Sequence, residues 1–461
     1  MIKYIYKNFL LNVVDKIKKT DNMAVYGDLK RTEYMDRAEL ERVQFDRLKN
    51  LVVHAYEHVP YYHDVFDKAE FSPYDFSYPE QLTVLPVLDK QTIRDNYDRL
   101  HADNASEYEP RVKSTSGSTG QPLVYESSRL AHSCGWPNVW LAFSVTGFEV
   151  GDSVVILAGG ALLPRSTTFT QKVYTRFMRI KQLPVYHMSE EEFGKYVHTL
   201  KTFGKPFVLY TYANAAYHFA LYVRNHGITG IPVKGVFTTS EVLGPHQRTA
   251  IEESLGCPVF DTYGNPESAL FAFECEEQSG LHYDMLHSYA EILNDNNDPV
   301  PYGEHGHIIS TNLANYVMPF IRYNTGDLGI LSTEEKCGCG RGYRKLSNII
   351  GRTRDVIYTP DGRKIHGAFF NHFEPFYTIP WIAGWHVLQD RIDHLTITIK
   401  PQGSPVEADI EEMTRLLKKG LHKSMAIEFT FDDKLQTTSA AKLKLIECKL
   451  DPDEINNITD A

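Results

Sequence analysis

The sequence predicts an α/β protein: a large layered domain of mostly parallel sheets with a β-rich subdomain, followed by a small α+β domain. Three observations predict this class. Short apolar runs alternate with helical segments through the middle of the chain, turn-bounded strands follow residue 285, and the composition changes again after Arg352. A chain of 461 residues also exceeds the size at which one hydrophobic core usually stops growing. We therefore expect one domain over residues 1–351 and a second over residues 352–461.

The amino-terminal region contains two helical patterns. Residues 1–19 mix lysines into a short apolar stretch, which favours an amphipathic surface helix, with binding to a membrane surface as the alternative. Residues 35–60 carry apolar side chains at near-helical spacing and end in a turn at Pro60. Asp89 is placed to cap a further short helix.

Apolar runs in the middle of the chain predict buried, largely parallel strands. They cover residues 153–158, 206–210, 233–238 and 259–263. Shorter strands are expected at residues 289–293, 307–310 and 318–323. Beyond Arg352 the pattern predicts a hairpin turn at residues 360–363, a strand at 394–399 and a helix at 410–421.

Composition excludes several classes of protein. The net charge of −11 argues against nucleic acid as a partner, because phosphate binding requires a basic face. No apolar run approaches the length of a transmembrane helix. Six cysteines in a chain this long do not form a secreted disulfide framework, so the cytoplasm is the expected compartment. Cys134, Cys257 and Cys448 are interpreted as buried free thiols.

Five short motifs stand in a fixed order along the chain. They are TSGSTGQP at residues 115–122, YGNPE at 263–267, YNTGDL at 323–328, GRTRD at 351–355 and TSAAK at 438–442. This series resembles the adenylate-forming superfamily of acyl-CoA synthetases, adenylation domains and luciferase-like enzymes. Within it the chain is most similar to the phenylacetate–CoA ligase branch and its capsule-biosynthesis relatives. Segments 49–66, 85–96 and 355–367 resemble that branch as well, so the likeness covers nearly the whole chain.

The resemblance implies that the first motif binds the β- and γ-phosphates of ATP with backbone amides and hydroxyls. The residues concerned are Ser116, Gly117, Ser118, Thr119 and Gly120. Read alone, the same stretch also fits a solvated linker, and it is not a Walker loop because no Gly-Lys-Ser/Thr follows. Glu267 would hold Mg²⁺ against the phosphates. The family usually has a hydroxyl residue before this glutamate, and here Pro266 stands in its place.

Further nucleotide contacts follow from the resemblance. Asp327 would accept hydrogen bonds from both ribose hydroxyls, and Arg352 would contact ribose or phosphate. Asp355 stands where the family has its interdomain hinge, about which the small domain rotates between two half-reactions. The remaining nucleotide-binding candidates are Ser240, Glu241, Tyr263 and Gly264.

Lys442 is the candidate catalytic lysine, since its ammonium could bridge the attacking carboxylate and the α-phosphate once the small domain closes. The family commonly has glycine before this lysine, whereas this chain has Ala441. Lys444 points to the same strand face and is the alternative register. Tyr210 and Tyr212 could line a pocket for an aryl or other compact apolar acid, although aromatic residues at this density also suit a plain core.

The spacing of four residues suggests structural Zn²⁺. Cys275, His282, Cys337 and Cys339 supply three thiolates and one imidazole, a closed tetrahedral set. The alternative is a group of buried free thiols.

The leading hypothesis is an ATP- and Mg²⁺-dependent ligase that forms an acyl-adenylate and passes the acyl group to a thiol, with coenzyme A as the first choice. The runner-up passes it to an amine or a carrier protein. A third hypothesis, motivated by Pro266 and Ala441, is a nucleotide-binding homologue without catalysis. A homodimer is also compatible with the resemblance.

Overall fold

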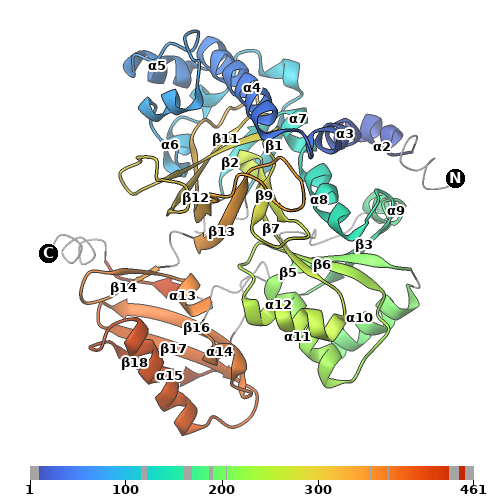
Figure 1. Ribbon diagram of the computed structural model, residues 1–461, viewed down its shortest axis with the longest axis vertical. Coiled ribbons are helices and arrows are strands. Elements are labelled where there is room, and N and C mark those ends of the chain that lie inside the picture. Colours follow the sequence, from blue (N-terminus) through green and yellow to red (C-terminus); the bar gives the residue numbers. More distant parts are fainter. Residues whose placement is uncertain are drawn as a thin grey trace.

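The computed structural model describes residues 10–115, 122–159, 169–185, 190–203, 205–352, 356–371, 373–433, 435 and 446–451. Helices and strands alternate through the middle of the chain, as the sequence predicts, and the predicted α/β class is confirmed (Figure 1).

The amino-terminal part is helical. It contains α2 (Leu11–Lys18), α3 (Asn22–Thr32), α4 (Arg37–His58), α5 (Pro60–Lys68) and α6 (Lys90–Asp95), with short 3-10 turns η2 (Pro79–Val84), η3 (Asp98–Leu100) and η4 (Ala105–Tyr108). As predicted, the Asp89 side chain caps α6 by accepting a hydrogen bond from the Thr92 amide at 2.7 Å. The turn predicted at Pro60 is wrong. Pro60 opens α5 instead, because proline fits the first helical position, where an amide proton has no intrahelical acceptor.

A mixed sheet of eleven strands forms the centre of the molecule, in the order β10-β11-β12-β13-β9-β8-β7-β6-β5-β3-β4. Its strands are β3 (Ser153–Ala158), β4 (Ile180–Pro184), β5 (Phe207–Tyr212), β6 (Val233–Thr239), β7 (Val259–Asn265), β8 (Leu270–Glu274), β9 (Leu281–Tyr283), β10 (Ser288–Leu293), β11 (His305–Asn312), β12 (Tyr323–Leu331) and β13 (Lys345–Arg352). The run β4-β3-β5-β6-β7 is parallel, which confirms the predicted buried strands, and the rest of the sheet is antiparallel.

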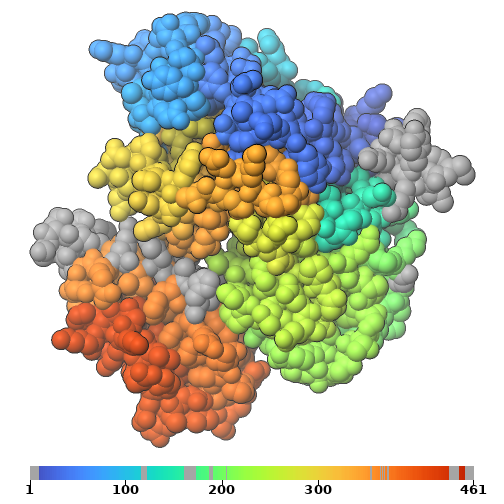
Figure 2. Space-filling view, viewed as in Figure 1, coloured from blue at the N-terminus to red at the C-terminus, as the bar shows by residue number. Residues whose placement is uncertain are grey.

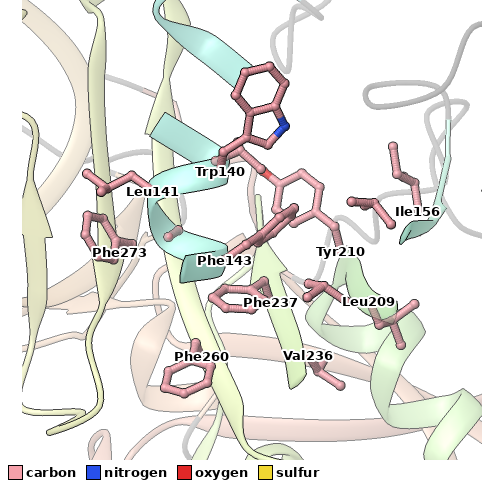
Figure 3. Packing of buried hydrophobic residues seen from close by; sticks show 14 of the residues in the cluster. Trp140, Leu141, Phe143, Ile156, Leu209, Tyr210, Val236, Phe237, Phe260 and Phe273 are labelled. Carbon is pink, nitrogen blue, oxygen red and sulfur yellow. The ribbon is translucent and has the colours of Figure 1, made fainter. Parts of the chain in front are cut away.

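Helices cover the parallel half of this sheet. They are α7 (Arg129–Ser133), α8 (Gly135–Phe143), α9 (Phe169–Phe177), α10 (Glu190–Thr202), α11 (Ala213–Asn225) and α12 (Pro245–Leu255). Figure 1 shows α11 and α12 lying together in front of β5 and β6. On β5 and β6, Tyr210 and Phe237 pack against Phe143 of α8, with ring centroids 5.7 Å and 4.9 Å from that of Phe143 (Figure 3).

One predicted strand is partly wrong. Residues 318–322 are irregular, and β12 begins only at Tyr323. Their backbone groups find partners outside any ladder: the Ile321 amide donates to Tyr62 Oη, and the Arg322 carbonyl accepts from the Leu88 amide, both at 2.9 Å. The apolar side chains of the segment are buried in a second hydrophobic cluster built largely from α4, α5 and the residues that follow them.

The carboxyl-terminal elements form a separate layered unit. They are β14 (Val356–Tyr358), β15 (Lys364–His366), α13 (Ala368–Asn371), α14 (Pro375–Thr378), β16 (Ile382–Arg391), β17 (His394–Pro401), α15 (Glu407–Gly420), β18 (Ala426–Phe431) and β19 (Ile446–Cys448). The predicted hairpin, strand and helix are confirmed as β14–β15, β17 and α15. β16 to β19 pair in the order β18-β17-β16-β19, and their hydrophobic cluster lies entirely between Ile357 and Ile446.

Figure 2 shows this unit as an orange and red lobe beside the green surface of the large sheet's helices. The two parts touch where Tyr377 of α14 stacks on His246 of α12, with ring centroids 3.4 Å apart. Among the residues that the structure describes, none of the helices is both long and apolar enough to span a lipid bilayer.

Candidate active site

Two of the predicted motifs meet at the antiparallel half of the large sheet. β7 carries Tyr263 and leads directly into Glu267, while β12 carries Tyr323 and Asp327. The Tyr263 hydroxyl donates to Asp327 Oδ2 at 2.8 Å, and the Tyr323 hydroxyl donates to Glu267 Oε1 at 3.2 Å. The fold therefore places the carboxylates predicted to bind ribose and Mg²⁺ in one site.

Glu267 lies in a tight 3-10 turn, η6 (Pro266–Ser268), at the end of β7. Asn265 holds this turn, because its side chain accepts from the Ser268 amide at 3.1 Å. The Glu267 carbonyl accepts from Asn312 Nδ2 at 3.0 Å, and its side chain is only 6% exposed. Pro266 occupies the first position of the turn, where a missing amide proton costs no hydrogen bond. The departure from the family pattern at Pro266 is thus compatible with the local backbone.

Residues on two strands orient the Asp327 side chain. Its register partner across β12 and β13 is Arg352, whose Nε lies 3.5 Å from Asp327 Oδ1. Gly326 precedes it with φ +77°, a conformation that suits glycine, and the Asp327 amide donates to Thr325 Oγ1 at 3.2 Å. Burial and the nearby Asp327 charge raise the pKa of Tyr263 well above its usual value. The Tyr263 hydroxyl therefore remains protonated and donates to Asp327.

The turn after β6 contains Ser240 and Glu241. Ser240 has φ +68°, and Glu241 Oε2 accepts from the Asn214 amide at the start of α11 at 2.9 Å. A carboxylate at a helix amino terminus is stabilised by the amides there, so Glu241 has a structural role besides the predicted nucleotide contact. Gly264 lies on β7 next to Tyr263, on the exposed side of the strand.

Asp261, on the same strand, was not predicted from the sequence. Its Oδ1 accepts from Thr238 Oγ1 at 2.6 Å and from the Thr262 amide at 3.0 Å. Burial raises the pKa of Asp261 to about 7, and the nearby Glu274 adds to the shift. The sequence alone could not predict the raised pKa of Asp261, because the burial of this carboxylate depends on the neighbouring strands.

Tyr210 and Tyr212 lie at the end of β5 and are 7% and 2% exposed. Figure 3 shows the Tyr210 ring among Trp140, Phe143 and Ile156. Burial raises the pKa of Tyr210, and hydrogen bonds with Thr239 and Thr262 oppose that rise. Both tyrosines belong to the main hydrophobic cluster, and their contact with an acyl group stays a prediction.

Several predicted residues lie outside the described part of the chain. They are Ser116, Gly117, Ser118, Thr119 and Gly120 of the first motif, the hinge candidate Asp355, and Lys442 with its alternative Lys444. The strands that flank the first motif are described: β1 (Arg111–Ser114) pairs with β2 (Val124–Ser127). Burial, and then the Glu267 charge, raise the pKa of Tyr125 on β2. The hairpin is tied to the large sheet by Asn315, whose side chain donates to the Glu126 carbonyl of β2 at 2.9 Å.

The four predicted zinc ligands converge. The ligand atoms of Cys275, His282, Cys337 and Cys339 all lie within 4.8 Å of one another. Cys275 Sγ is 3.6 Å from Cys337 Sγ, and Cys339 Sγ is 3.3 Å from His282 Nε2. His282 Nδ1 lies 2.8 Å from the Tyr343 carbonyl, which can only accept, so Nδ1 carries the proton and Nε2 is left to bind a metal. A hydrogen bond with Cys275 lowers the pKa of the Cys339 thiol.

The loop that carries Cys337 and Cys339 is anchored on the amino-terminal helices. Gly342 donates its amide to the Glu33 carbonyl at 2.9 Å, and an added Cβ there would lie 2.0 Å from the Met35 carbonyl oxygen. The hydroxyls of Thr32 and Tyr343 are 2.9 Å apart. The end of α3 is therefore fixed to this loop, and only glycine fits at residue 342.

Comparison with known proteins identifies the family. No family model matches the chain. The phenylacetate-coenzyme A ligase of Aromatoleum evansii is 31% identical over 342 residues, which are 72% of this chain and 74% of that protein. The chain belongs to the phenylacetate-coenzyme A ligase family. The Escherichia coli K12 member is 27% identical to this ligase over 404 residues, 84% of this chain and 88% of that protein.

Solved structures show the same fold for this family member. 2-Hydroxyisobutyryl-CoA ligase in the postadenylation state with 2-HIB-AMP covers 94% of both chains at 21% identity, with a TM-score of 0.70. The same ligase with 2-HIB-AMP and CoA in the thioesterification state gives a TM-score of 0.59 at 22% identity. The shared architecture is an adenylate-forming ligase fold, with a large and a small domain.

Proposed function

We propose that this ligase uses ATP to convert a carboxylic acid into an acyl-adenylate and then transfers the acyl group to the thiol of coenzyme A. The observation that carries the proposal is the buried pair Glu267 and Asp327, brought together by tyrosine hydrogen bonds in a member of the phenylacetate-coenzyme A ligase family. In the first half-reaction the acid's oxygen bonds to the α-phosphorus and the bond to pyrophosphate breaks. In the second, sulfur bonds to the acyl carbon, the thiol loses its proton, and AMP leaves.

The described residues have distinct parts in this scheme. Asp327, oriented by Tyr263 and Arg352, accepts hydrogen bonds from the ribose hydroxyls and fixes the nucleoside. Glu267 would hold Mg²⁺, which supplies positive charge to the phosphates when it is bound. Lys442 would bring a further positive charge to the α-phosphate during adenylation. Ser116 to Gly120 would surround the β- and γ-phosphates.

The proposal includes two domains that meet near Arg352, with the hinge at Asp355. It is supported by the hydrophobic cluster that lies wholly between Ile357 and Ile446 and shares no residue with the clusters of the large part. A small domain with its own core can rotate as a unit, which is the motion that two half-reactions in one site require.

The proposed acid is compact and apolar or aryl, with Tyr210 and Tyr212 at its pocket. Both side chains are buried and the Tyr210 ring packs on Phe143, so a group that reaches them would have to be small. We place the reaction in the cytoplasm, where ATP and coenzyme A are available. All six cysteines are in the described part of the chain and form no disulfide, as suits a reducing compartment.

We also propose a structural Zn²⁺ at the four-residue cluster. A tetrahedral zinc with bonds of about 2.0–2.3 Å holds its ligand atoms about 3.3–3.8 Å apart. The 3.3 Å and 3.6 Å separations match this geometry, and the His282 tautomer leaves Nε2 available. The cluster lies on β9 and on the connections that follow β8 and β12, so the metal would hold the antiparallel half of the sheet together.

The experiment that tests the function measures pyrophosphate release with ATP, Mg²⁺ and a panel of aryl and short apolar carboxylic acids. Release with at least one acid, followed by detection of its acyl-CoA by mass spectrometry when coenzyme A is added, is the expected result. An amide formed from added amines, with no thioester, would assign the chain to the amide-forming alternative. No pyrophosphate with any acid would favour a non-catalytic nucleotide-binding protein.

A further inference from the structure

The two motif strands exchange hydrogen bonds in a reciprocal pattern. Tyr263 precedes Glu267 by four positions, and Tyr323 precedes Asp327 by four positions. Each tyrosine hydroxyl donates to the carboxylate of the other motif rather than to the carboxylate of its own motif. Strands β13, β9 and β8 lie between β12 and β7 in the sheet, so these side chains join strands that are distant in the ladder.

Tyr323 is held rigidly. Its side chain is 0% exposed, and its ring packs on Phe320 with centroids 5.3 Å apart. On either side of it, the Arg322 carbonyl accepts from the Leu88 amide, and the Asn324 amide donates to the Leu88 carbonyl, both at 2.9 Å. The hydroxyl therefore has a fixed position from which it reaches Glu267.

The bond has a chemical consequence for Glu267. A carboxylate that binds a metal is oriented by the groups that donate hydrogen bonds to it, and their removal weakens metal binding. The Tyr323 hydroxyl donates to Oε1 and so restricts the orientation of the Glu267 carboxylate, which would hold Mg²⁺. A phenol hydroxyl can donate and a carboxylate oxygen can only accept, so Tyr323 is the donor in this hydrogen bond.

We propose that Tyr323 is a positioning residue that orients Glu267 for Mg²⁺, while Tyr263 orients Asp327 for the ribose. This inference rests on the proposed function and gives the two tyrosines different roles. Tyr323 acts on the metal requirement, and Tyr263 acts on nucleoside affinity.

The test compares three Tyr→Phe variants, each of which keeps the ring and removes one hydroxyl. Tyr323→Phe should raise the Mg²⁺ concentration needed for half-maximal pyrophosphate release by about tenfold, while AMP affinity without metal is unchanged. Tyr263→Phe should weaken AMP binding and leave the Mg²⁺ requirement unchanged. The matched control is Tyr62→Phe, because the buried Tyr62 hydroxyl donates to the Pro319 carbonyl and accepts from the Ile321 amide, both at 2.9 Å. This control should lower thermal stability only.

A double-mutant cycle connects the effect to Glu267. Glu267→Gln should itself raise the Mg²⁺ requirement, and Tyr323→Phe added to it should raise it little further, since both changes act through one carboxylate. An unchanged Mg²⁺ requirement in a folded Tyr323→Phe protein, or an equal rise in Tyr62→Phe, would overturn the inference and leave the proposed function standing. A wild-type protein that binds no AMP would overturn both.

Discussion

At the scale of single residues, the two carboxylate oxygens of Asp327 have different partners. Oδ2 accepts from Tyr263, and Oδ1 faces Arg352. Both partners lie on strands, so the carboxylate proposed to bind the ribose is already oriented when no nucleotide is bound. Such pre-orientation lowers the entropic cost of binding a ligand.

Asp327→Ala is expected to weaken ATP binding strongly. Each hydrogen bond to a charged acceptor contributes about 1.5–3 kcal/mol, so the loss of even one ribose contact lowers affinity by about tenfold or more. Titration calorimetry with ATP and with AMP measures this loss. Replacement of Asp295, an exposed carboxylate beyond β10, serves as the control and should leave affinity unchanged. Near-native affinity in Asp327→Ala would remove this residue from the nucleotide site.

Asp261 gives a prediction about pH. Its pKa in the folded protein is about 7, above the value near 3.9 in an unfolded chain. The folded state then binds the extra proton, so this group favours folding below about pH 4 and loses that contribution as pH rises to 7. Asp261→Asn should therefore raise the melting temperature relative to wild type at pH 8 and have little effect at pH 4. An equal shift at both pH values would show that the titration of Asp261 is not the cause.

Single residues also show which contacts of the candidate site could not be predicted from the sequence. The motifs single out Glu267, Asp327 and Arg352 as candidate site residues, because chemistry of this kind depends on short local patterns. Nothing local links Tyr323 to Glu267 or Glu241 to Asn214, since those partners are set by how distant strands and helices meet. The buried Arg322, which pairs with Glu291 and donates to the Thr83 carbonyl, would be taken for a surface residue from sequence alone.

At the scale of secondary-structure elements, periodicity predicted most of the parallel strands and the helices α4 and α15. It failed at residues 318–322, where an apolar run imitates a strand. The run is buried for a different reason: its backbone bonds go to Tyr62 and Leu88 rather than to a ladder. Burial and extended conformation produce similar patterns in short segments, so hydrophobicity alone could not separate them.

The connection between β12 and β13 carries the proposed metal ligands Cys337 and Cys339. Purified protein should contain about one zinc by atomic emission spectroscopy, and Cys337→Ser combined with Cys339→Ser should remove it and lower the melting temperature. Cys448→Ser, which changes a half-buried thiol of the small unit, is the matched control and should retain the metal. Native protein without metal would leave these residues as free thiols.

At the scale of the whole molecule, the question is how two half-reactions share one site. Lys442→Ala should slow acyl-adenylate formation by at least about 100- to 1000-fold, because it removes a preorganised charge from a developing oxyanion. Transfer of the acyl group from a supplied acyl-adenylate to coenzyme A should survive, since the proposed rotation of the small domain would have withdrawn the lysine by then. Pyrophosphate release and thioester formation, measured separately, check the two expectations.

Lys444→Ala is the control that tests which of the two lysines is catalytic. This variant should keep most adenylation activity. A larger loss of adenylation activity in Lys444→Ala than in Lys442→Ala would assign the catalytic role to Lys444. Equal impairment of both half-reactions by Lys442→Ala would contradict the domain rotation rather than the enzyme class.

The contact between Thr32 and Tyr343 has a consequence for how a ribosome makes this protein. The two hydroxyls are separated by 311 positions in the chain. At about 5–20 residues per second, about 15–60 s pass between the synthesis of one partner and the other. During that interval the end of α3 also lacks the hydrogen bond that the Tyr343 hydroxyl donates to the Leu29 carbonyl at 3.3 Å. The end of α3 therefore completes its native contacts only after about three quarters of the chain has been synthesised.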